Sequence, residues 1–97
     1  MEAITEDQLA EVERFARGFA SPKTICLVME WDFAEMQSCF TNMQHPVARA
    51  YHKGKEKRIL EINLVVVDQA AAGSSVAQAL AEKLSEDQSV KEANELG

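Results

Sequence analysis

Apolar side chains recur at every third or fourth position near the start of the chain, which predicts helices that bury one face. The first helix begins after Thr5, because Thr5 and Gln8 have the spacing of a capping box, in which each side chain bonds the backbone N–H of the other. Gly18 or the Ser21-Pro22 pair ends this helix. Its apolar face is expected to consist of Leu9, Val12, Ala16 and Phe19.

The next two apolar segments predict a helix-turn-helix motif at residues 22–41. Ser21 and Pro22 suit the cap and first position of a helix over roughly 22–30. Asp32 and Glu35 repeat the capping-box logic at the start of a second helix near residue 33. Two short helices with apolar faces and a tight turn between them are typical of a steep helix crossing. Glu30 occupies the turn, where glycine is often found.

A long helix is predicted over residues 46–72, although residues 59–67 also fit a strand. Residues 60–64 alternate apolar and polar side chains, and the three valines that follow favour strands. The same residues also fit helix faces, and the candidate partner strand at 24–31 has better helix signals. Gly73 suits a helix end.

The last helix is expected at residues 75–85, with a capping box at Ser75 and Gln78 and an exposed or frayed segment at 86–97. Ninety-seven residues suit one domain. We therefore expect an all-α fold of four or five helices in a single domain, residues 1–97.

The charge is distributed unevenly along the chain. The net charge is −6, which disfavours a general nucleic-acid binder. Residues 49–58 are the exception, with five basic side chains and one acidic side chain. This segment is the place where phosphate contacts are expected, although a solvated helix face gives the same pattern. On a helix, Arg49, Lys53 and Lys57 share one face, and His52 and Lys55 form an adjoining line.

No pattern in the sequence supports catalysis, a metal or a cofactor. Cys26, Cys39, His45 and His52 have the spacing C-x12-C-x5-H-x6-H, whereas structural zinc sites pair ligands two to four residues apart. No glycine-rich phosphate loop and no nucleophile elbow occur. The acidic N-terminus lacks a secretory signal, and no apolar run reaches the length of a membrane span. We therefore expect a cytoplasmic protein that does not contact membranes.

Three segments carry a family resemblance. Residues 21–26 (SPKTIC), 45–55 (HPVARAYHKGK) and 72–78 (AGSSVAQ), the last followed by LAEKL at 80–84, resemble the small terminase subunits of phages. This resemblance implies an all-helical fold, binding of double-stranded DNA by the helix-turn-helix, self-association through the later helices and delivery of DNA to a packaging motor. One departure is that the second helix of the motif has no Lys or Arg.

Two hypotheses about function follow. In the first, an oligomer binds DNA, with base contacts and phosphate contacts at Gln37, Ser38, Thr41, Arg49, His52, Lys53, Lys55 and Lys57. In the second, the chain is a helical protein-interaction module and the helix-turn-helix is only architectural. Both include self-association, because one monomer's core cannot readily cover the apolar side chains of Ile59, Ile62, Leu64, Val65, Val66 and Val67.

Overall fold

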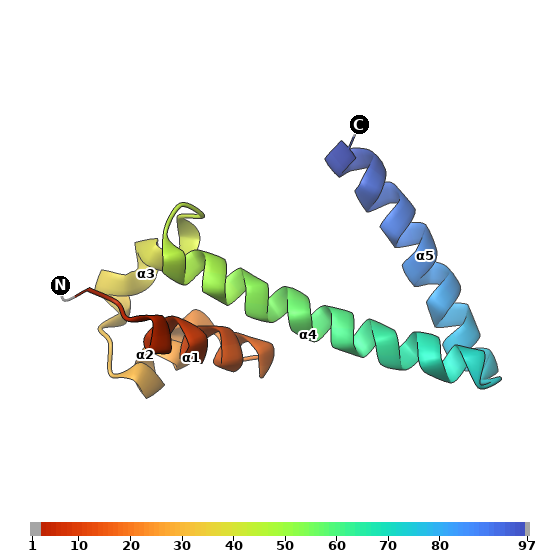
Figure 1. The fold of residues 1–97 in the computed structure, drawn as a ribbon, viewed down its shortest axis with the longest axis horizontal. Coiled ribbons are helices and arrows are strands. Elements are labelled where there is room, and N and C mark those ends of the chain that lie inside the picture. Colours follow the sequence, from red (N-terminus) through yellow and green to blue (C-terminus); the bar gives the residue numbers. More distant parts are fainter. Residues whose placement is uncertain (1–2, 97) are drawn as a thin grey trace. The chain divides into compact units, whose positions relative to one another are not determined.

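The computed structural model describes residues 3–96, which form five α-helices and no strand (Figure 1). The helices are α1 (Glu6–Arg17), α2 (Pro22–Met29), α3 (Phe33–Thr41), α4 (Pro46–Ala71) and α5 (Ser75–Leu96). The predicted all-α fold is therefore confirmed. Residues 59–67 lie inside α4, so the helical alternative holds for the segment that also fitted a strand.

The helix starts follow from the predicted caps. The Thr5 hydroxyl accepts the Gln8 N–H at 3.1 Å, and the Gln8 side-chain oxygen accepts the Thr5 N–H at 2.9 Å. Ser21 and Asp32 cap α2 and α3 by accepting the N–H group three residues later, each at 3.3 Å. Each cap satisfies an N–H group that has no partner inside the helix, which fixes where the helix begins.

The last helix begins at Ser75, as predicted, but its capping residue and its end differ from the prediction. Ser74, not Ser75, is the capping side chain, because its hydroxyl accepts the Ala77 N–H at 3.3 Å. The helix does not end near residue 85 but continues to Leu96, so residues 86–96 are exposed, as one of the two alternatives predicted, and are helical. Residues 86–96 contain no glycine or proline, and Gln88 bonds Glu92 one turn later at 2.9 Å. The apolar pattern fades after residue 85 because the side chains there are no longer buried, although the helix continues.

The chain divides into two compact units, Met1–Ile59 and Leu60–Gly97, where the sequence suggested one domain. The division falls within α4.

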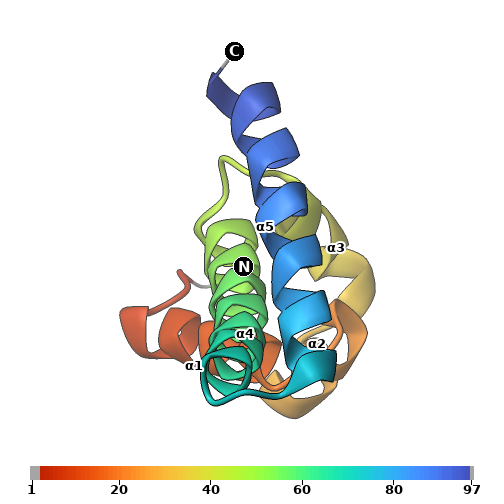
Figure 2. The same cartoon turned by 90° about the vertical axis from the view of Figure 1, so that its right-hand side faces the viewer.

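The first unit has a small, well-formed core. α1, α2 and α3 gather around the N-terminal half of α4 (Figures 1 and 2). The buried cluster draws on all four helices and consists of Val12, Ala16, Ile25, Cys26, Met36, Phe40 and Val47. Phe19 is not part of it: this residue lies after the end of α1 and its side chain is 68% exposed, so the predicted apolar face stops at Ala16.

Close contact between α1 and α4 depends on Gly54. A Cβ added at Gly54 would overlap the Glu13 carbonyl oxygen and lie 2.8 Å from the Ala16 Cβ. These distances are shorter than van der Waals contact, so the two helix backbones meet where a side chain is absent. Gly54 therefore sets how closely α4 packs on α1.

The second unit has very little core. Ala77 is its one buried apolar residue within the described range 60–96. α5 is tied to the end of α4 by polar contacts, including the Gln78 side-chain amide, which donates to the Ala70 carbonyl at 3.2 Å. Many large apolar side chains of this unit are exposed, namely Leu60, Ile62, Leu64, Val65, Val67, Val76, Leu80, Val90 and Leu96.

Candidate nucleic-acid interface and assembly surface

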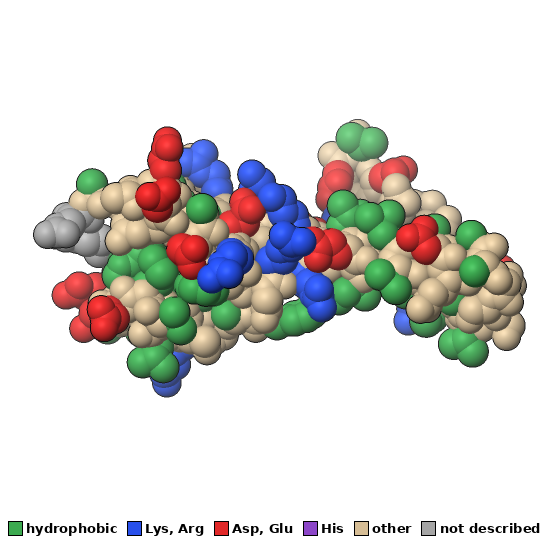
Figure 3. Space-filling model, turned by 60° about the horizontal axis from the view of Figure 1, so that its bottom comes forward, with side chains coloured by type: hydrophobic (Ala, Val, Ile, Leu, Met, Phe, Trp, Pro, Cys, Tyr) green, Lys and Arg blue, Asp and Glu red, His purple; other side chains and the backbone are tan. Residues whose placement is uncertain are grey.

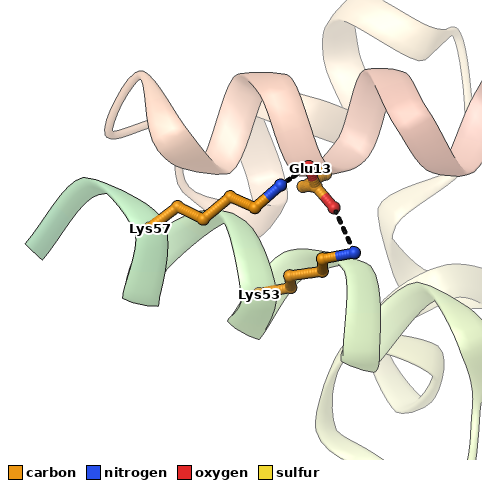
Figure 4. Close-up of polar contacts among 3 residues, drawn as sticks. All are labelled: Glu13, Lys53 and Lys57. Carbon is orange, nitrogen blue, oxygen red and sulfur yellow. Dashed lines mark hydrogen bonds and ion pairs between the residues drawn. The ribbon is translucent and has the colours of Figure 1, made fainter. Parts of the chain in front are cut away.

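Two of the predicted phosphate-binding lysines contact an acidic side chain of α1. The Lys53 and Lys57 ammonium groups lie 3.5 and 2.9 Å from the two carboxylate oxygens of Glu13 (Figure 4). The two lysines share a face, as their spacing predicted, but that face is directed at α1. The hydrogen bond from Lys57 lowers the pKa of Glu13, against the opposing effect of burial. Glu13 therefore cancels part of the positive charge of the basic segment.

The remaining cations of the segment have different surroundings. Arg49 is exposed and reaches the Gln44 carbonyl at 3.5 Å, near the start of α4. Lys55 is exposed and its ammonium lies 5.3 Å from the centre of the Tyr51 ring, while the His52 ring lies 5.5 Å from that ring. Figure 3 shows acidic side chains interleaved with the basic ones on one face. The segment is thus a mixed-charge surface in which Arg49 and Lys55 are exposed cations.

The predicted base-reading residues lie on a different helix. Gln37, Ser38 and Thr41 are exposed on α3, while Met36 and Phe40 face the core. The Thr41 hydroxyl donates to the Ser38 carbonyl at 3.2 Å, which leaves its oxygen able to accept. α3 therefore presents a short polar surface at Gln37, Ser38 and Thr41 that has no basic side chain, and the exposed carboxylate of Glu35 lies one turn from Ser38.

Cys26 is buried in the core of the first unit, and His45 supports the start of α4. Burial raises the pKa of the Cys26 thiol, which disfavours the thiolate needed for nucleophilic or metal chemistry. His45 accepts the Val47 N–H through Nδ1 at 3.1 Å and so supports the start of α4. Within residues 3–96, no three His, Cys, Asp or Glu side chains are grouped so that they could hold a metal ion.

The predicted oligomerisation residues form an exposed apolar surface. Ile59, Ile62, Leu64, Val65 and Val67 are exposed, and Val66 is half-buried. Three further apolar side chains that were not among the predicted residues are also exposed, namely Leu60, Val76 and Leu80. The signal for Leu60 was available, because the apolar residues at 59–67 occur on every side of α4. We call the seven exposed side chains of this group that lie in the second unit the assembly surface: Leu60, Ile62, Leu64, Val65, Val67, Val76 and Leu80.

The chain matches no protein-family model, no curated protein and no solved structure. The resemblance to terminase small subunits therefore stays a prediction. None of the helices in the described part of the chain is long and apolar enough to cross a bilayer.

Proposed function

We propose that this chain is a non-catalytic assembly protein that binds copies of itself through the assembly surface. The observation that supports this proposal is a contrast within residues 60–96 of the second unit, where Ala77 is the one buried apolar residue and many large apolar side chains are exposed. Helices in proteins are held mainly by packing of an apolar face. A helix pair that buries so little within one chain needs apolar surface from elsewhere.

The apolar gain from covering the assembly surface is of the same order as the cost of association. Fully burying a Val, Leu or Ile side chain contributes roughly 1.5–3 kcal/mol, so covering the exposed half of such a side chain contributes about 0.75–1.5 kcal/mol. Six such side chains on each of two copies contribute roughly 9–18 kcal/mol in total. Association costs about 4–15 kcal/mol, so a stable dimer is within reach. A surface that meets its own copy forms an isologous pair.

Charged substitutions on the assembly surface test this proposal. Leu60 and Leu64 lie one helical turn apart and are 58% and 50% exposed. Replacing both with lysine should leave each chain folded and lower the particle mass measured by light scattering, because buried charges would oppose contact. Leu27→Lys is the matched control, since Leu27 is 79% exposed in the first unit. An unchanged mass in the Leu60→Lys/Leu64→Lys variant would contradict the proposal.

Duplex DNA is a second candidate partner, as the terminase resemblance implies. The observation that favours it is the exposed polar surface of α3, with Gln37, Ser38 and Thr41 in the second helix of a helix-turn-helix. Exposed Arg49 and Lys55 could contact phosphates. In this model an oligomer presents several such units to one duplex and delivers it to a packaging motor.

Salt-dependent DNA binding tests the second candidate. Fluorescence anisotropy with a labelled duplex should show affinity that falls as salt rises, because phosphate contacts release counterions. Arg49→Gln with Lys55→Gln should weaken binding for every sequence and flatten the salt dependence by about one unit per lost contact. Lys83→Gln with Lys91→Gln, on α5, is the control with the same change in net charge. Absence of binding at low salt would remove DNA from the function.

A further inference from the structure

An aromatic side chain is held at the surface of the first unit by an unusual backbone conformation. Phe19 follows the end of α1 with φ of 68°, in the left-handed region that favours glycine. Its N–H donates to the Ala16 carbonyl at 3.1 Å, and the following N–H donates to the Phe15 carbonyl at 3.0 Å. The ring stays largely exposed, with the Arg58 guanidinium 4.8 Å from its centre. These bonds form the usual left-handed cap of a helix end, and this cap leaves the Phe19 ring in water beside Arg58.

Phe19 forms one wall of an apolar hollow of about 290 Å3. Tyr51 and Ile59 of α4 also line it, together with two small alanines of the α1 end. Lys55 and Arg58 add two cationic side chains, three residues apart on α4. We call this site the Phe19 hollow. It suits an apolar side chain that is accompanied by acidic groups, and its apolar lining does not suit DNA.

The chain itself contains a segment with that chemistry. Glu82, Glu86 and Val90 are each four residues apart on α5, so they lie on one helix face. All three are exposed, and the Val90 side chain is 63% exposed. Ala93 and Leu96 continue the apolar part of this stripe at three-residue spacing.

We propose that the Phe19 hollow of one copy binds the Glu82–Glu86–Val90 face of α5 from a second copy. Val90 would enter the hollow against Phe19, and the two glutamates would meet Lys55 and Arg58. Opposite charges on two pairs with similar spacing give this contact its orientation, and burial of two apolar side chains gives it affinity. The contact is additional to the isologous pairing through the assembly surface and does not depend on it.

This second contact changes the kind of assembly that the chain forms. The hollow and the α5 face are different surfaces. Each copy would therefore bind one neighbour through its hollow and another neighbour through its α5 face. Such head-to-tail contacts do not end with a pair; they close into rings or continue as filaments. Together with the isologous surface, they would link pairs into larger particles.

Complementary variants of the full chain test the proposal. Phe19→Gly removes the wall of the hollow and suits the positive φ, so the fold should be kept, with equal or higher thermal stability by circular dichroism. Glu86→Lys with Val90→Gln disables the α5 face at exposed positions. Each variant alone should have a lower mass by light scattering than the wild type. A 1:1 mixture should be heavier than either variant alone, because each supplies the surface that the other lacks.

The outcomes separate this proposal from isologous pairing. Wild-type mass in both single variants, or a mixture no heavier than its components, would overturn the Phe19 hollow contact. That result would leave the assembly surface standing if Leu60→Lys/Leu64→Lys still lowers the mass. Conversely, the mass could rise when the two variants are mixed while the Leu60→Lys/Leu64→Lys variant keeps the wild-type mass. That result would support the hollow contact alone. High salt should reduce the recovery, since two ion pairs at an exposed rim are screened.

Discussion

The close crossing of α1 and α4 makes Gly54→Ala a sharp test of the first unit's packing. Alanine at this position would place its methyl group against the Glu13 carbonyl oxygen, 2.8 Å from the Ala16 Cβ and 3.1 Å from the Arg17 backbone nitrogen. The obstacles are mainly backbone atoms, which cannot rotate away. α1 must therefore move outward by about 1 Å to reach ordinary van der Waals contact.

That movement has a cost that exceeds the gain in helix propensity. Overpacking a core typically costs about 1–3 kcal/mol. We expect a cost of about 3 kcal/mol here, because the clash is with backbone atoms. Alanine in place of glycine favours a helix by about 1 kcal/mol. We expect a net loss of about 2 kcal/mol in the free energy of unfolding, which corresponds to a fall in Tm of roughly 10 °C for a chain of this size.

Urea and thermal unfolding followed by circular dichroism measure this loss. Gly18→Ala is the matched control, because a Cβ there lies no closer than 3.4 Å to its neighbours and φ is −88°. This control should change stability by no more than about 0.5 kcal/mol. If Gly54→Ala were as stable as the wild type, the helices would not be in backbone contact at Gly54, and the reasoning would be refuted.

Two further substitutions probe the first unit. Glu30 caps α2 with φ of 61°, so Glu30→Gly should stabilise the fold by about 1 kcal/mol in urea unfolding; a loss of stability would show that the carboxylate, not the backbone, matters there. The pKa of Glu13 is lowered in the folded chain, so this residue stabilises the fold above its ordinary pKa of 4.5 and that stabilisation disappears as pH falls through the lower folded value. Stability of Glu13→Gln should therefore fall less between pH 5 and pH 3 than that of the wild type, and equal slopes would contradict the Lys57 contact.

The local signals in the sequence predicted the fold well because they act over a few residues. Thr5, Ser21 and Asp32 each satisfy an N–H group three residues later, and this requirement is visible in the sequence. The end of α5 was missed because helix formation and burial were treated as one signal. In residues 86–96 they separate: the backbone is helical while the side chains stay exposed.

The candidate sites were harder to predict because they depend on contacts between distant residues. Helical spacing correctly placed Lys53 and Lys57 on one face, but nothing in that spacing indicated that Glu13, forty residues before Lys53 and forty-four before Lys57, lies opposite them. The Phe19 hollow was missed for the same reason. Phe19 fitted the apolar face of the first helix, and only the early end of α1 removes it from the core.

The scarcity of burial in the second unit has a thermodynamic consequence. A segment stabilised chiefly by partners folds to an extent set by mass action, so its melting temperature rises with protein concentration. Under the proposed self-association, each tenfold dilution below saturation removes about 1.4 kcal/mol of this support. The helices beyond residue 59 would then melt first, while the core around Ile25 and Val12 persists. The folded fraction of the second unit would therefore depend on protein concentration. At low concentration only the first unit would be folded, and at high concentration self-association would fold the second unit as well.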